Sequence, residues 1–156
     1  MLDFFQAIEN AGVTQVIKNS TWAFAVIESI HLLALAIMGG AVLLVDFRLL
    51  GLGLTTRPVK ELAAEMSRYV TLALIVLIVT GVGLFATEAT KCYYSTPFWV
   101  KMITLALATV FTFTVRRGTI NTLTMDVSGG ARGIALVSVA LWFTVAAAGR
   151  WIGFSG

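Results

Sequence analysis

Four long apolar stretches, separated by short polar breaks, dominate the pattern of the chain. Each is long enough to cross about 30 Å of hydrocarbon as a helix, which takes about 20 residues. None shows the alternation of a membrane β-strand. Because lipid offers no partners to backbone polar groups, the pattern predicts an all-α integral membrane protein whose four transmembrane helices form a bundle. The predicted helices are residues 22–54, 69–88, 98–117 and 133–154, in a single membrane domain of residues 1–156.

Residues 1–19 have a different pattern. Phe4 and Ile8 recur at helical spacing with polar residues around them, which predicts an amphipathic helix lying at the membrane interface. Asp3 and Glu9 stand where a secretory signal peptide would carry basic residues, so we do not expect this segment to be one.

Composition supports the membrane assignment. Hydrophobic residues make up 58% of the 156 residues and charged residues 12%, against about 25% charged in soluble domains. The mean hydropathy is +0.92. These values exclude an ordinary cytosolic enzyme, a disordered tail and a disulfide-stapled secreted module. The net charge of +3 is not read as a sign of nucleic-acid binding, because the basic residues fall mainly in the breaks between apolar runs.

The same basic residues predict the orientation. Seven of the eleven Lys and Arg residues fall on one side of the predicted topology and four on the other. The positive-inside rule places the richer side in the cytoplasm. We therefore expect a multi-pass protein of the bacterial inner membrane with both termini on the periplasmic side. The first set is Arg48, Arg57, Lys60, Arg68, Arg116, Arg117 and Arg132, and the second is Lys18, Lys91, Lys101 and Arg150.

Ionisable residues inside the predicted spans are the candidates for function. His31 is the single histidine, and it lies about 14 Å along the first span at 1.5 Å per residue. Glu28 precedes it by three positions and so shares its helix face. Lys101 on the third span and Arg150 on the fourth lie in the same half of the membrane as His31 and Glu28, the half on the predicted periplasmic side, which we call the outer half. Glu88 ends the second span on that side. The topology predicts that these side chains converge in one outer-half pocket.

Structural alternatives exist for each of these residues. Lys101 and Arg150 are close enough to the helix ends to reach lipid headgroups, and Glu88 is close enough to water to be a simple helix end. Glu28 and His31 can also be a hydrogen-bonded pair in the core. At the opposite ends of the spans, Asp46 is expected to pair with Arg116 or Arg117 as a structural clamp.

The ligand chemistry is limited by the single histidine and the single cysteine, Cys92. Bis-histidine haem ligation within one chain, a disulfide and a cysteine metal cluster are all excluded. Haem held by His31 alone, with Lys101 or a methionine, or between two protomers remains open. Copper held by His31 with Met38 or a carboxylate is possible but under-ligated.

Several short runs resemble an uncharacterised family of small bacterial membrane proteins with four helices. The family is a domain of unknown function, so the resemblance implies architecture and little chemistry. The runs are Glu28-Ser-Ile-His31, Gly39-Gly40 and Asp46-Phe-Arg48-Leu-Leu-Gly51 in the first span, Thr80-Gly81 in the second, Phe98-Trp-Val-Lys101 in the third and Gly149-Arg150-Trp151-Ile152 in the fourth.

A looser pattern is similar to CopD-type copper-resistance proteins and HemJ-type protoporphyrinogen oxidases. Both have a histidine in an early helix and a lysine that opens a later one. In the HemJ type these residues are linked to haem binding and activity, which implies corresponding roles for His31 and Lys101. The chain lacks the further histidines of those proteins and their aromatic-Pro-Arg run after the first helix.

The sequence therefore predicts an outer-half pocket that binds a redox cofactor, haem b or a quinone. His31 would be its ligand or hydrogen-bond donor and a tentative metal ligand, and Glu28 would orient His31 and accept its proton. Lys101 and Arg150 would anchor propionates or a quinone oxygen. One alternative is a non-catalytic accessory or scaffold subunit of a larger membrane complex, and a weaker one is a proton or metal-ion carrier. The expected partners are the lipid bilayer and either further copies of the chain or other subunits.

Overall fold

The computed structural model describes residues 2–123 and 127–152, which form helices joined by short connections. Four helical segments of this described part are long and apolar enough to cross a membrane, which confirms the all-α membrane fold. The elements are α1 (Leu2–Glu9), α2 (Gly12–Asn19), α3 (Thr21–Leu50), α4 (Val59–Thr87), α5 (Ala89–Tyr94), α6 (Thr96–Phe111), the π-helix η1 (Thr112–Arg116), α7 (Arg117–Thr122) and α8 (Gly129–Ile152).

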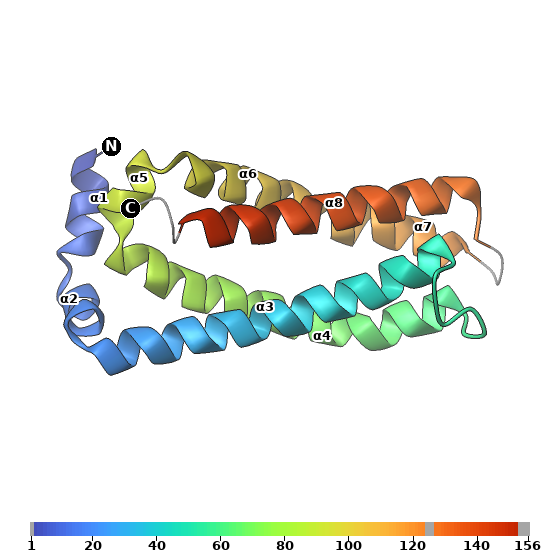
Figure 1. The fold of residues 1–156 in the computed structure, drawn as a ribbon, viewed down its shortest axis with the longest axis horizontal. Helices are drawn as coiled ribbons and strands as arrows, with labels where there is room; N and C mark the ends of the chain where they lie inside the picture. The colour runs from blue at the N-terminus through green and yellow to red at the C-terminus, as the bar shows by residue number, and fades with distance from the viewer. Residues whose placement is uncertain (1, 124–126, 153–156) are drawn as a thin grey trace.

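The long helices form two pairs (Figure 1). Helix α3 packs along α4, and α6 packs along α8. The pairs are joined mainly through the contact of α3 with α8. Helices α1 and α2 lie across one end of the bundle, where α5 also lies (Figure 1). The bundle therefore has a capped end at α1, α2 and α5, and an opposite end at the connection between α3 and α4.

Several helix boundaries differ from those predicted. The third helical segment covers Thr96–Thr122 instead of 98–117, and the fourth begins at Gly129 instead of 133. Helix α4 begins at Val59, ten residues before the predicted start at residue 69, because Val59 and Leu62 are buried against α3 and extend the helix beyond its apolar span. Helix α3 ends at Leu50, since Gly51 adopts a left-handed conformation with φ of 78°. The last predicted residues of the fourth span, 153–154, lie outside the described residues.

The predicted interfacial helix is two helices, α1 and α2, with a break between them. Phe5 is buried in α1 and packs edge-on against Phe85 of α4 and Tyr93 of α5, with ring centroids 5.6 and 5.1 Å away. The carboxylate of Glu9 accepts a hydrogen bond from the backbone N–H of Thr90 at 3.0 Å. These contacts attach the N-terminal helices to the end of the bundle.

A buried ion pair joins α3 to the π-helix. The Arg116 Nε donates to Asp46 Oδ1 at 2.7 Å, which confirms the predicted clamp. The guanidinium also donates to the Val42 carbonyl at 3.3 Å. A π-turn inserts one residue into a helix and so changes which side chains face inward. Here both ends of η1 point into the bundle, because Thr112, like Arg116, is buried. The Trp142 Nε1–H donates to the Thr112 hydroxyl oxygen at 3.1 Å.

Most of the buried apolar side chains lie in one half of the bundle. Two core clusters use residues 38–49 of α3 and 59–74 of α4, together with Ile120, Ala131 and Ala135. We call this the packed half, and it contains the Asp46–Arg116 pair.

Toward the capped end the packing changes. No described side chain in residues 22–33 of α3, 75–86 of α4 or 96–107 of α6 is buried. We call these three segments, with the facing part of α8, the open half. Figure 1 shows the two helix pairs lying further apart here than in the packed half. Only 17% of the apolar window of α4 and 11% of that of α6 is buried in the protein, so much of the apolar surface is left for lipid to cover.

Candidate cofactor site in the open half

His31 on α3 is hydrogen-bonded to Thr80 on the neighbouring helix α4. Its Nδ1 lies 2.8 Å from Thr80 Oγ1, which joins α3 to α4. The Thr80 hydroxyl also lies 2.7 Å from the Val76 carbonyl oxygen. A carbonyl only accepts, so the single hydroxyl proton goes to Val76 and the oxygen accepts from His31. His31 Nδ1 therefore carries a proton, and in the neutral ring Nε2 carries the lone pair.

The second nitrogen of this ring is available. Among the described residues no group is hydrogen-bonded to His31 Nε2, and the imidazole is only half-buried. Gly81 provides the surface on which the ring lies, since a Cβ at that position would be 3.4 Å from His31 Cε1. A fixed Nδ1–H donor with an unbonded Nε2 is the usual arrangement of a histidine that ligates a metal through Nε2.

Lys101 is the second polar side chain of the open half. It lies along α8 at Gly149, where a Cβ would be 3.4 Å from Lys101 Nζ. The described residues offer this half-buried ammonium no hydrogen bond or ion pair. Lys101 is close enough to His31 for its charge to act on the imidazole. A cation withdrawn from water without a partner is costly, so this ammonium favours an anionic or strongly accepting ligand.

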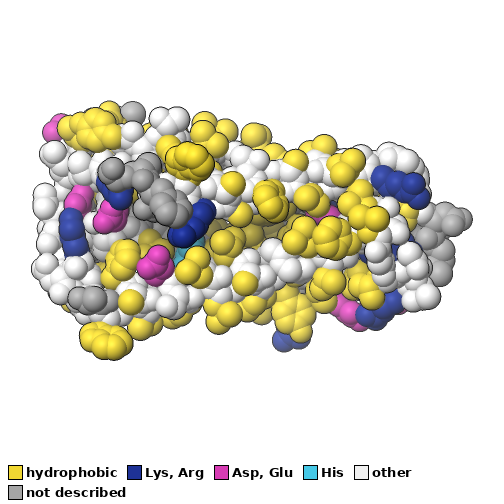
Figure 2. All heavy atoms as spheres, viewed as in Figure 1, with side chains coloured by type: hydrophobic (Ala, Val, Ile, Leu, Met, Phe, Trp, Pro, Cys, Tyr) yellow, Lys and Arg dark blue, Asp and Glu magenta, His cyan; other side chains and the backbone are white. Residues whose placement is uncertain are grey.

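Glu28 does not have the role expected of an orienting partner. His31 Nδ1 is bound to Thr80, and no hydrogen bond joins the ring to Glu28 within the described residues. Glu28 is exposed on α3, one turn nearer the capped end, and within the described residues it makes no hydrogen bond or ion pair. Figure 2 shows the single histidine, in cyan, between a basic and an acidic side chain on the face seen in Figure 1. Glu28 therefore borders the site without fixing the ring.

The other two predicted members lie at the margin. Arg150 is exposed in the last turn of α8, at the capped end. Glu88 follows the end of α4 and pairs with Lys91 at 3.7 Å, so it behaves as an exposed helix end. His31 and Lys101 are thus the two candidates that the structure brings together in the open half, with Thr80 as a member that the sequence prediction missed.

The described residues contain no group of three His, Cys, Asp or Glu side chains that could hold a metal ion. Met38 is packed in a core cluster of the packed half, which removes support for a copper site with His31. Burial raises the pKa of the Cys92 thiol to about 11, with the nearby Glu88 carboxylate adding to the effect. Cys92 therefore stays protonated near neutral pH and is a poor nucleophile or ligand.

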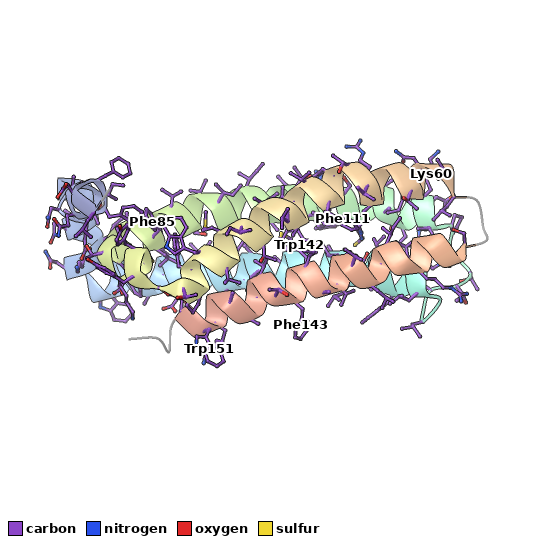
Figure 3. All side chains as sticks on the ribbon, turned by 90° about the horizontal axis from the view of Figure 1, so that it is seen from above. Lys60, Phe85, Phe111, Trp142, Phe143 and Trp151 are labelled. Carbon is purple, nitrogen blue, oxygen red and sulfur yellow. The ribbon has the colours of Figure 1, made fainter. Side chains whose placement is uncertain are left out.

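A groove on the surface of α6 and α8 lies outside the His31–Lys101 region. It has a volume of about 900 Å³ and runs between α6 and α8, lined by side chains that include Val100, Ala140, Phe143 and Trp151. Figure 3 shows Phe143 and Trp151 pointing outward from α8, whereas Trp142 points into the bundle. None of the lining side chains is charged. We assign this groove to the lipid-facing surface and not to the candidate site.

These features define a small helical membrane protein with four candidate spans and a half-buried histidine and lysine in the less packed half of its bundle. The chain belongs to the family of unknown function DUF6644, whose profile matches residues 4–155. This confirms the resemblance to an uncharacterised family. Neither a curated protein nor a solved structure matches the chain. The similarity to CopD-type and HemJ-type proteins gains no support from these comparisons and stays a prediction.

Proposed function

We propose that this chain binds a redox cofactor, haem b or a quinone, in the open half of its bundle, in a bacterial inner membrane with both termini on the periplasmic side. The observation that carries the proposal is that Thr80 holds the Nδ1–H of His31, while no described group is hydrogen-bonded to Nε2. An Nε2 lone pair suits both candidates, because it can ligate haem iron or accept a hydrogen bond from a quinol hydroxyl.

Two further observations support the proposal. Lys101 supplies a positive charge near His31 for a haem propionate or a quinone oxygen. The open half has few buried side chains, so a flat apolar ligand can cover surface that the protein leaves uncovered. When bound, such a cofactor supplies electron transfer. His31 would then orient it, and Lys101 would bind a haem propionate or a quinone oxygen.

Binding of each candidate to the purified full chain tests the proposal. Haem b is titrated by absorption, and a short-chain quinone by calorimetry, into wild type, His31→Ala and Leu32→Ala. Leu32 is the matched control because it neighbours His31 on α3 but is 56% exposed. We expect saturable binding of one ligand that His31→Ala abolishes and Leu32→Ala preserves. Absence of binding of both ligands, or equal binding to all three proteins, contradicts the proposal.

Purification from the native membrane tests the alternative that the chain is an accessory subunit. If wild type purifies from its native membrane with stoichiometric partner subunits and binds neither ligand, the chain is a structural subunit. The carrier alternative requires proton or metal-ion flux in liposomes that Glu28→Gln abolishes.

A further inference from the structure

A second groove lies in the packed half, at the end of the bundle opposite the α1–α2 cap. It has a volume of about 190 Å³ and runs between α4 on one side and η1 with α7 on the other. Ala41 and Val45 of α3 line it, and so do Val70 and Phe113. Figure 3 shows Lys60 at this end of α4, far from Phe85 at the capped end.

The described residues at the rim of this groove carry two positive charges that no described carboxylate pairs with. Lys60 and Arg117 both line it, both are exposed, and neither has a hydrogen bond or ion pair among the described residues. Arg116 also lines the groove, but its charge is balanced by Asp46. Among the described residues, no acidic side chain lines the groove.

The nearest acidic residues of α4 act elsewhere. Glu65 forms an ion pair with Arg57 at 2.9 Å, and the charge of Glu61 also acts on Arg57. Glu65 is therefore engaged outside the groove, and neither of these two carboxylates is among its described lining residues. This leaves Lys60 and Arg117 as two cations facing the space between α4 and α7.

The groove is also polar at its rim and apolar along its length. Ser67 and Asn121 add hydrogen-bonding groups to the lining, Ser67 about two turns deeper along α4 than Lys60 and Asn121 one turn beyond Arg117 on α7. From Lys60 to Val70 the α4 wall descends about 15 Å, at 1.5 Å per residue, toward the middle of the span. Basic residues at the end of a transmembrane helix lie at headgroup depth, and basic pockets between such helices suit anionic lipid headgroups.

From this charge and shape we infer that the groove binds an anionic phospholipid. The phosphate contacts Lys60 and Arg117, and the start of one acyl chain lies over Ala41, Val45 and Val70. This site is independent of the cofactor site proposed above.

The test uses the full chain in mixed micelles with equal amounts of phosphatidylglycerol and phosphatidylcholine, and native mass spectrometry counts the retained lipids. We expect wild type to retain phosphatidylglycerol preferentially. Lys60→Gln combined with Arg117→Gln should lower that preference roughly twenty-fivefold, since each basic residue near an anionic headgroup contributes on the order of a fivefold gain. Both side chains are exposed, so the variant should fold.

The matched control removes the same charge at the same end through Arg68→Gln and Arg132→Gln, two exposed residues that do not line the groove. This control variant should keep the preference for phosphatidylglycerol. Ala64→Leu narrows the groove without changing its charge and should also reduce retention. Equal retention of the two lipids by wild type, or equal losses in the two double variants, would overturn the inference. Displacement of the lipid by inorganic phosphate would also overturn it, by showing an anion site that needs no acyl chain.

Discussion

The Nδ1 of His31 lies 2.8 Å from the hydroxyl oxygen of Thr80, and this bond joins α3 to α4 in the half of the bundle with few buried side chains. The bond fixes which ring nitrogen carries the proton. The imidazole lies over the Gly81 backbone, where a Cβ would be in ordinary contact with the ring at 3.4 Å.

Removing the Thr80 hydroxyl should weaken cofactor binding without abolishing it. In Thr80→Val the ring keeps its position over Gly81 but loses its acceptor, so Nε2 is less well oriented. Loss of such an outer partner typically lowers ligand affinity about tenfold to a hundredfold. The dissociation constant measured in the binding titration tests this, and Thr80→Ser should restore most of the affinity. An unchanged constant in Thr80→Val would show that the bond does not position a ligand.

Gly149 should limit the position of Lys101. A Cβ there would lie 3.4 to 3.7 Å from the Lys101 side chain, which is an ordinary contact, so Gly149→Ala should retain binding. Gly149→Leu should displace the ammonium and weaken binding by about as much as Lys101→Gln does. Titration of the cofactor into the three variants measures whether their affinities follow this order. If Gly149→Leu binds as wild type does, Lys101 is not an anchor.

The Asp46–Arg116 pair should contribute strongly to stability. Breaking a buried pair by removing one partner leaves an unpaired buried charge, which typically costs about 3–5 kcal/mol. We expect that loss in Arg116→Ala and in Asp46→Ala, measured as the free energy of unfolding in mixed micelles. The double variant Asp46→Leu with Arg116→Met should be less destabilised than either single variant. A double variant as unstable as the sum of the single ones would contradict this reading.

The N-terminal helices should detach as the pH falls. Hydrogen bonds from Lys18 first, and from Thr90, lower the pKa of Glu9 from 4.5 to about 2. Because the pKa of Glu9 is lowered in the folded state, its carboxylate stabilises the attachment of α1 and α2 fully above about pH 4.5. This stabilisation is lost as the pH falls through about 2. Amide exchange in residues 2–19, corrected for intrinsic rates, should rise over this window.

Glu9→Gln should show faster exchange already at neutral pH. Asp3→Asn is the control, since it removes a charge from the same helix at an exposed position. If exchange in the two variants is equal, Glu9 does not hold the cap.

Cys92 should be slow to alkylate. A thiol pKa of about 11 against the ordinary 9.0 leaves about a hundredfold less thiolate at pH 8. Maleimide labelling of the folded chain should therefore lag that of the chain unfolded in detergent by about this factor, and should accelerate as the pH rises. Fast labelling at neutral pH would show that the thiol is accessible and ionised.

Much of the fold was predictable because it depends on hydropathy and helix length. The four spans follow from apolar stretches, and the pairing of Asp46 with Arg116 follows from two opposite charges at the same depth. The break between α1 and α2 and the π-turn at Thr112 depend on tertiary packing, which leaves no periodic signal in the sequence.

The site was only partly predictable. His31 and Lys101 stood out because ionisable groups inside a span are rare. Thr80 did not, because a threonine in a transmembrane helix usually bonds only to its own backbone, as Thr71 and Thr144 do here. Glu28 was expected to orient His31 from its spacing of three residues, but the competing partner lies 49 residues away in the chain.

The spectrum of the protein as it leaves its native membrane tests the central claim most directly. Gently solubilised wild type and His31→Ala are compared in oxidised and dithionite-reduced form, and their lipid extracts are assayed for quinone. We predict either a Soret band that shifts on reduction or a stoichiometric quinone in wild type, with the same signal absent from His31→Ala. A colourless, quinone-free wild type, or a signal that survives in His31→Ala, would contradict the account.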